Sequence, residues 1–217
     1  VQDKKYGASL FFDKIWSEKN DNVSFLVAKN GHIIYENYMG FANKSTDEKI
    51  TRETPLHIAS VSKVLTATAT LMLVDAKKLK LDQKVTTILE NFPYPDVTIQ
   101  TLLNHRSGMK NYAYFTFENN NWDKKKTLTN ADIIKVMVEK EIPLERKTDT
   151  GFSYNNTNYA VLALIIEKIT GLTYAEAMSE MIFKPLGMDN TFVFEIEKHK
   201  GTVAPSYKGN NMEIGLD

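Results

Sequence analysis

An unbroken apolar stretch restricts the fold of this 217-residue chain more than any other feature does. From Val64 to Val74 the residues are apolar or small on nearly every face of a helix. An amphipathic helix covers a core with one face, whereas a helix of this kind has to be surrounded by other elements. We therefore expect a buried helix that continues to about Lys78.

Two polar residues, Ser60 and Lys63, lie at the start of this helix. Residues three apart share a helix face, so the two side chains can reach each other. A serine hydroxyl is a weak nucleophile until a base takes its proton, and a lysine beside a buried helix loses hydration, which favours the neutral amine. The N–H groups at the helix start can also stabilise a developing negative charge. The pair therefore predicts a nucleophile with its base, although Ser-x-x-Lys alone is more often a helix cap followed by a solvated lysine.

Composition excludes several classes of function. Lysine plus arginine and aspartate plus glutamate both number 27, and a solvated loop explains the cationic cluster at 124–126. We therefore expect no nucleic-acid partner. The chain has no cysteine, which excludes disulfides, thiol nucleophiles and cysteine-ligated metals. Because His32, His57 and His199 lack the spacing of metal ligands, we expect no metal site and no cofactor.

Hydrophobic periodicity and turn residues outline the other elements. An amphipathic helix is expected at 6–16, and two β-rich runs at 23–28 and 32–39 flank an Asn30-Gly31 hairpin turn. Further segments are expected in chain order: a loop at 43–53, an extended segment at 55–58, helices at 81–89, 99–103, 131–140, 158–169 and 174–183, a loop at 111–126, and a strand at 191–194. Asn130 is the expected cap of one helix, Gly171 ends another, and Thr173 opens a capping box.

The order of these elements predicts an α+β fold. A hairpin comes first, a block of helices follows, and another strand begins near the end. This order fits an antiparallel sheet built from both ends of the chain, with a helical lobe inserted between them. We expect residues 1–50 to form the first part of the sheet domain, residues 51–190 the helical lobe, and residues 191–217 the return to the sheet. Two strands and a fragment make a marginal sheet, so the sheet is expected to be incomplete in this chain.

Four patterns in a fixed order carry a resemblance to a known family. They are Ser60-x-x-Lys63, Leu-Leu-Asn-His-Arg-Ser-Gly at 102–108, Tyr154-Asn155-Asn156, and Phe-Lys-Pro-Leu-Gly-Met at 183–188. From about Val23 to about Tyr207 the chain resembles the class C β-lactamase and penicillin-binding serine hydrolases, a family that also contains esterases and D-amino-acid peptidases. The resemblance implies a multi-layer αβα, β-lactamase/transpeptidase-like fold. It also favours export to the periplasm or the cell envelope.

The resemblance implies a role for each of four residues. Ser60 would be acylated, Lys63 would accept or relay its proton, and Tyr154 would be the partner base or the proton donor to the leaving group. Asn156 would hydrogen-bond Lys63 and the amide of the substrate. A tyrosine ordinarily has a pKa near 10, and a neighbouring ammonium favours its ionised form. The implied function is hydrolysis of a β-lactam, a small ester or a D-amino-acid peptide through a Ser60 acyl-enzyme.

Each candidate also has a duller alternative. Tyr154 could be a partly buried tyrosine with a satisfied hydroxyl, and Asn156 could cap the helix that follows it. Ser62 could line the site or face solvent. His105 could be a third catalytic residue, but a loop histidine before Ser-Gly is more often a structural hydrogen-bonding group. The protein as a whole could be a non-catalytic sensor or a module that binds peptidoglycan or penicillin.

The third motif of the family, a Lys-Thr-Gly or His-x-Gly triplet on a late strand, has no counterpart after Tyr154. The triplet at 199–201 has the letters of His-x-Gly, but it follows the 183–188 segment too closely. In the family, a backbone N–H of that strand supplies half of the oxyanion hole. We therefore expect this chain to be the N-terminal portion of a longer protein, whose missing C-terminal portion is needed to complete the fold.

Overall fold

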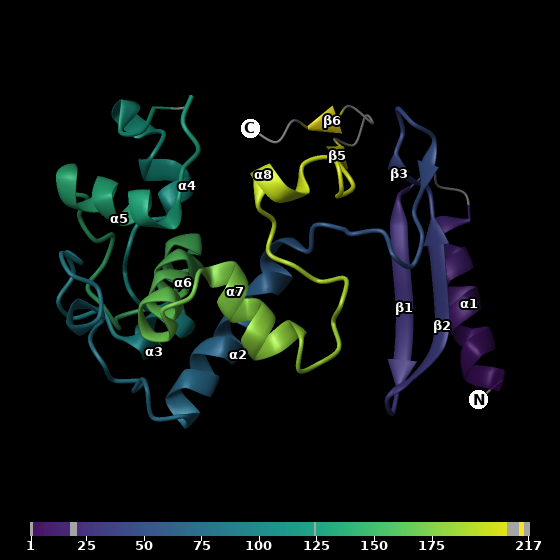
Figure 1. The fold of residues 1–217 in the computed structure, drawn as a ribbon, viewed down its shortest axis with the longest axis horizontal. Coiled ribbons are helices and arrows are strands. Elements are labelled where there is room, and N and C mark those ends of the chain that lie inside the picture. The colour runs from purple at the N-terminus through teal and green to yellow at the C-terminus, as the bar shows by residue number, and fades with distance from the viewer. Residues whose placement is uncertain (1, 18–20, 124, 208–212, 215–217) are drawn as a thin grey trace. The chain divides into compact units, whose positions relative to one another are not determined.

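The structure is a computed structural model that describes residues 2–17, 21–123, 125–207 and 213–214. The chain divides into two compact units (Figure 1). The first, here called the sheet unit, consists of Val1–His57 and Glu195–Asp217. The second, here called the helical unit, consists of Ile58–Phe194.

The sheet unit begins with the predicted helix and hairpin. Helix α1 (Gln2–Trp16) packs against strands β1 (Val23–Lys29) and β2 (His32–Met39), which pair antiparallel. At the hairpin turn, Asn30 and Gly31 both have positive φ, 53° and 76°. Two residues with positive φ form the tight turn whose twist matches that of the flanking strands. The helix and the hairpin predicted from the sequence are therefore confirmed.

Aromatic side chains hold α1 on the hairpin. Phe12 is buried, and its ring centroid lies 5.5 Å from that of Phe25 and 6.1 Å from that of Tyr35. Trp16 adds a contact at 5.4 Å to Phe25. Tilted aromatic pairs at these distances stabilise a fold beyond the area that they bury. The cluster explains why a short helix and a single hairpin pack together here.

The other strands differ from the sequence-based prediction. The expected loop at 43–53 contains a small hairpin of β3 (Phe41–Asn43) and β4 (Glu48–Lys49). The expected strand at 191–194 has no regular structure, and the strands lie further along, in β5 (Ser206–Tyr207) and β6 (Glu213–Ile214). The backbone N–H of Lys44 donates to the Tyr207 hydroxyl at 3.0 Å, which ties the two ends of this unit together.

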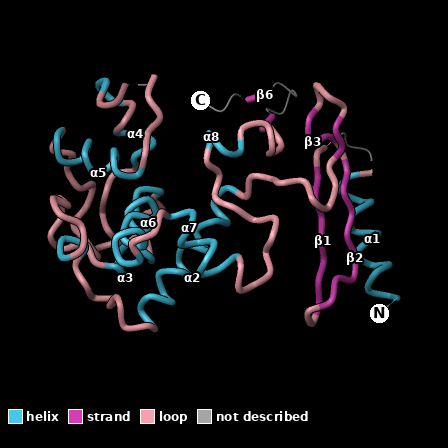
Figure 2. Tube along the Cα trace, in the orientation of Figure 1, coloured by secondary structure: helices cyan, strands magenta, loops and turns pink. Residues whose placement is uncertain are grey.

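In its described residues the helical unit consists of helices and loops, while the strands belong to the sheet unit (Figure 2). Its elements are η1 (Ala59–Val61), α2 (Ser62–Asp75), η2 (Val85–Thr87), α3 (Ile99–Leu103), α4 (Tyr112–Phe115), η3 (Glu118–Asn120), α5 (Asn130–Glu139), α6 (Asn156–Thr170), α7 (Tyr174–Met178) and the π-helical η4 (Ser179–Phe183). Helix α6 lies at the centre, in contact with α2, α3, α5 and α7. Val161, Leu162, Ile165 and Ile166 of α6 are fully buried.

The prediction that α2 is buried on all sides is wrong for the described residues. Thr66, Ala69, Thr70 and Leu73 face the core. Other apolar residues of the helix are exposed, namely Val64 at 63%, Leu71 at 48% and Met72 at 41% of their surface. The elements that pack on α2 are α6, α7 and η4, and they leave these three side chains uncovered. The sequence shows that a helix face is apolar, but it does not show which element covers that face.

Some boundaries predicted from the sequence also differ. The expected helix at 81–89 is the single turn η2, and the expected loop at 111–126 contains α4 and η3. Thr129, rather than Asn130, caps α5, because its hydroxyl forms a capping box with Asp132. The capping box at Thr173 and the left-handed glycine that ends α6 are confirmed.

A backbone ladder joins the 105–108 segment to the 145–153 segment. The N–H of Glu145 donates to the Gly108 carbonyl at 2.9 Å, and the N–H of Ser153 donates to the His105 carbonyl at 2.9 Å. The Arg106 guanidinium pairs with Asp149 at 2.5 Å. Because the second segment leads directly to Tyr154, this ladder fixes how the chain approaches α6.

Replacing Gly108 with alanine is expected to destabilise the protein more than the same change at Gly171. Both glycines have left-handed backbone, with φ of 78° and 72°, so both alanines cost about 1–2 kcal/mol in backbone strain. A Cβ at Gly108 would also overlap the carbonyl of Arg146, while one at Gly171 meets open space. Overpacking adds about 1–3 kcal/mol. Equal losses in the free energy of unfolding, measured by denaturant titration of Gly108→Ala and Gly171→Ala, would contradict this account.

Candidate active site

A strained turn presents Ser60 at the start of α2. Ala59 has a φ of 45°, a left-handed conformation that is costly for any residue with a side chain. The Ser62 hydroxyl donates to the Ala59 carbonyl and closes the turn. Ser62 is therefore engaged at the helix start, and the exposed side chain of Ser60 is free to take other partners.

The structure brings together the three residues that the sequence suggested as catalytic. Lys63 Nζ donates to Ser60 Oγ at 3.1 Å, as expected for residues three apart on a helical turn. Tyr154 Oη donates to the same oxygen at 2.7 Å, although it lies 94 residues further along the chain. Ser60 Oγ is thus held between an amine and a phenol, which is the arrangement that a serine nucleophile requires.

Electrostatics favour the ionised form of Tyr154. The hydrogen bond from Lys63 is the main cause that lowers the pKa of Tyr154, and the hydrogen bond to Ser60 adds to it. Lys63 Nζ also lies 5.0 Å from the centre of the Tyr154 ring and 5.7 Å from that of Tyr159. Half of the Tyr154 side chain is exposed, so the tyrosine is open to a ligand as well as to Lys63. The catalytic role of Tyr154 stays a prediction.

A hollow of about 500 Å³ lies beside these groups within the helical unit. The surface of the hollow is mostly apolar. The residues that line it are Ser60, Lys63, Val64, Ala67, Thr68, Leu71, His105, Tyr154 and Tyr159. Apolar walls with a few polar groups at one end are typical of small-molecule sites.

Asn156 does not make the contact that the resemblance implied. It is the first residue of α6, and its Oδ1 is buried with no hydrogen-bond partner among the described residues. The structure records no hydrogen bond from Lys63 to this oxygen. The cap of α6 is Asn155, whose side chain accepts from the N–H of Thr157 at 2.8 Å. Asn156 therefore keeps an unused acceptor near Tyr154, and its role stays a prediction.

Sequence reasoning missed the residues that support the site from beneath. Asn155 and Asn158 are buried and hydrogen-bonded to the 105–109 segment, and Tyr159 stacks on His105. His105 makes no hydrogen bond to Ser60 or Lys63, and it touches Tyr154 through the ring faces. A polar residue such as Asn158 inside an apolar helical run was the available signal, because a buried amide needs specific partners.

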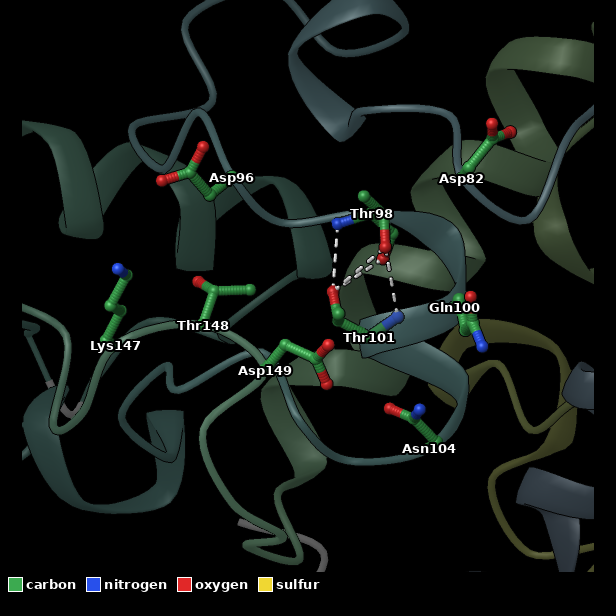
Figure 3. Close-up of a pocket in the computed structure, with 9 residues that line it drawn as sticks. All are labelled: Asp82, Asp96, Thr98, Gln100, Thr101, Asn104, Lys147, Thr148 and Asp149. Carbon is green, nitrogen blue, oxygen red and sulfur yellow. Dashed lines mark hydrogen bonds between the residues drawn. The ribbon is translucent and has the colours of Figure 1, made fainter.

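A second hollow, of about 520 Å³, has a polar lining (Figure 3). It lies between the start of α3 and the 147–149 loop, and the side chains drawn there include three aspartates. Several of its polar groups are already paired: Asp96 with Lys84, Asp149 with Arg106, and Thr98 with Thr101. Among the described residues its lining offers no buried polar atom without a partner.

The described residues offer neither a metal site nor a membrane-spanning helix. Within residues 2–17, 21–123, 125–207 and 213–214, no group of His, Asp or Glu side chains is arranged to hold a metal ion. In the same ranges, none of the helices has the length and the apolar character needed to cross a bilayer.

Comparisons with known proteins point to one family. A family model described as Beta-lactamase matches residues 11–216. Penicillin-binding protein 4* of Bacillus subtilis (strain 168) is 33% identical over 193 residues, which are 89% of this chain and 42% of that protein. Esterase EstB of Burkholderia gladioli is 29% identical over 213 residues, which are 88% of this chain and 53% of that protein.

A solved structure agrees with these relatives. The octameric penicillin-binding protein homologue from Pyrococcus abyssi matches with a TM-score of 0.76 and 29% identity. The match covers 95% of this chain and 48% of that one. The chain thus spans about half the length of the relatives that it matches.

Replacing Lys63 with methionine is expected to raise the pKa of Tyr154, because the strongest cause of its lowered value is removed. The tyrosinate absorbance of each protein is titrated with base, and the signal of Tyr154 is the part lost in Tyr154→Phe. Lys80→Met, at an exposed lysine beyond α2, is the matched control and should leave this titration unchanged. A Tyr154 titration that is the same in Lys63→Met and in the unaltered protein would refute the coupling.

Proposed function

Because the chain belongs to the beta-lactamase family, we propose that it carries the acylation site of a serine hydrolase, with Ser60 as the nucleophile. The fold of the chain is β-lactamase/transpeptidase-like. One observation supports the proposal above all others: Ser60 Oγ lies 3.1 Å from Lys63 Nζ and 2.7 Å from Tyr154 Oη. Because the chain spans about half of its relatives, the activity of the whole protein is part of the proposal.

The first chemical step transfers a proton within this group of three. With Tyr154 ionised, its oxygen takes the proton of Ser60 while the Ser60 oxygen bonds to the carbonyl carbon of the substrate. The ammonium of Lys63 stabilises the tyrosinate that acts as the base in this step. Acid–base catalysis of this kind contributes about 10²–10⁴-fold in rate.

The second step releases the leaving group and the acyl group. The bond between the carbonyl carbon and the leaving nitrogen or oxygen breaks as Tyr154 returns the proton to that atom. Water then attacks the acyl carbon and gives its proton to Tyr154. The bond between that carbon and Ser60 Oγ breaks, and Tyr154 passes the proton to the Ser60 oxygen, which regenerates the hydroxyl. The unpaired Oδ1 of Asn156 is suited to accept an N–H of a bound amide.

The substrates proposed for the site are β-lactams, small esters or D-amino-acid peptides. Each has an acyl carbon that Ser60 could attack, and the hollow at Ser60 is largely apolar, so it suits an apolar substituent on the substrate. The relatives include a penicillin-binding protein and an esterase. Among the described residues the second oxyanion donor is not assigned: the triplet at 199–201 lies at the end of the short helix α8 (Ile196–His199) and not on a strand.

A covalent adduct on Ser60 is expected when the protein reacts with a fluorescent penicillin or an aryl phosphonate. Intact-mass and peptide mass spectrometry should place one adduct on Ser60, and Ser60→Ala should abolish it. Ser24→Ala, at an exposed serine of strand β1, is the matched control and should leave the adduct on Ser60. Adduct with no turnover would favour the binding module instead, and no adduct with either reagent would count against the proposed function.

Replacing Tyr154 with phenylalanine is expected to slow acylation of Ser60 on the order of a hundred- to ten-thousand-fold, because it removes only the proton-transfer oxygen. The rate of adduct formation is measured by stopped reaction and mass spectrometry. Tyr6→Phe removes an exposed phenol in the sheet unit and should react at the unaltered rate. A rate in Tyr154→Phe within about twofold of the unaltered protein would exclude Tyr154 as the proton carrier.

A further inference from the structure

His105 lies beneath Tyr154 in a buried polar cluster. Only 9% of its surface is exposed. Its Nδ1 accepts the backbone N–H of Asn155 at 3.1 Å, and it lies 3.1 Å from Nδ2 of Asn158. Both asparagines are buried as well. The imidazole therefore contacts the peptide that directly follows Tyr154.

The neighbouring hydrogen bonds determine which nitrogen of His105 carries the proton. Ser107 Oγ accepts the N–H of Met109 at 3.2 Å and donates to Asn158 Oδ1 at 2.6 Å. The Nδ2 of Asn158 is therefore the atom that faces His105, and it is a donor. Two donors point at Nδ1, so this nitrogen needs a lone pair and the proton of the neutral ring is on Nε2.

The ring of His105 also supports the aromatic side chains of the site. Its centre lies 4.6 Å from that of Tyr154, 5.2 Å from that of Tyr159 and 5.9 Å from that of Phe152. The Tyr154 ring is tilted by 39° to the imidazole and the Phe152 ring by 84°. One residue thus touches the Tyr154 ring and the peptide N–H on its C-terminal side.

We propose that uncharged His105 is a positioning residue that holds Tyr154 Oη against Ser60 and releases it when the imidazole takes up a proton. The proposal rests on the proposed function, because it assigns His105 a task in the Ser60–Tyr154 contact. A proton on Nδ1 would face the two N–H donors of Asn155 and Asn158 and would break both hydrogen bonds. The peptide group between Tyr154 and Asn155 would then lose its hydrogen bond to His105.

Burial and the Lys63 ammonium oppose protonation of His105. Burial is the main cause that lowers the pKa of His105, the ammonium of Lys63 on α2 acts in the same direction, and the hydrogen bond from Asn155 acts in the opposite one. Of the other titratable groups packed on the ring, Tyr159 is neutral because burial raises its pKa, whereas the ionised form of Tyr154 favours a charged imidazole. The adjacent Arg106 directs its guanidinium to Asp149. Because the folded-state pKa lies below the unfolded value of about 6.5, this histidine destabilises the folded protein as pH falls below that value.

Two substitutions at His105 distinguish the effect of its hydrogen-bond acceptor, Nδ1, from the effect of its aromatic ring. His105→Asn offers an oxygen close to the place of Nδ1 and suits the φ of 58° at this position, because asparagine tolerates left-handed backbone. His105→Phe keeps a ring but has no acceptor. His32→Asn, at an exposed histidine of the sheet unit, is the matched control. The rate of Ser60 labelling by an aryl phosphonate is measured for each from pH 4.5 to 8, a range of about two units on either side of the ordinary histidine value.

His105→Phe is expected to label on the order of a hundredfold more slowly than the unaltered protein, because Tyr154 is displaced. His105→Asn should remain within about tenfold of it and should lose the part of the acid decline that His105 causes. A decline in both variants that follows only their free energies of unfolding, with the pH profile unchanged, would show a merely structural role and overturn the proposal.

The protonation state of His105 can also be tested in the unaltered protein, by a measurement that requires neither a folded variant nor enzymatic activity. The chain has four histidines, and ¹⁵N correlation spectra of their side chains report the tautomer and the titration of each. The expected result is a neutral His105 with an unprotonated Nδ1 and a pKa below the ordinary histidine value. An Nδ1–H tautomer, or a charged His105 at neutral pH, would overturn the proposal. Absence of any label on Ser60 would instead refute the proposed function. The question whether His105 positions Tyr154 would then still be decided by the tautomer of His105 and by the titration of Tyr154 in His105→Phe.

Discussion

The site depends on the hydrogen bonds of buried polar side chains where the 105–109 segment meets the first turn of α6. The polar side chains of His105, Ser107, Asn155 and Asn158 are all buried there, and all have partners. An unpaired buried polar group costs about 1–3 kcal/mol, so few arrangements of the chain are open at this point. Tyr154 and Asn156 flank Asn155 in the sequence, so the hydrogen bonds that hold Asn155 also fix the backbone of these two residues. Packing of α2 on α6 then brings Ser60 to Tyr154.

Features with a local physical cause could be predicted from the sequence. The Asn30-Gly31 turn needs two residues that tolerate positive φ, and the capping box at Thr173 is complete within four residues. Ser60 and Lys63 meet because they are three residues apart at a helix start. Tyr154 could be named only because its motif resembles that of a family. A spacing of 94 residues does not by itself predict that the Ser60 and Tyr154 side chains meet.

Features that depend on distant partners could not be predicted. Val64 and Leu71 look like core residues in the sequence, yet no described element covers them fully. Asn155 and Asn156 are both good caps, and the choice between them is made by the contacts of Asn155 with the 105–109 segment. In the same way, the buried role of Asn158 needs Ser107 and His105, which lie some fifty residues earlier.

The contact between Ser60 and Tyr154 has a consequence for the order of folding events. It closes a loop of 94 residues, within which α3, α4 and α5 also have to find their places around α6. Long-range closure is slow because its entropy cost precedes the gain from the contact. The contact between Ser60 and Tyr154 therefore forms only after α6 has packed on α2, late in the assembly of the helical unit. If Ser60 reacts as proposed, its rate of labelling during refolding reports how far that assembly has gone.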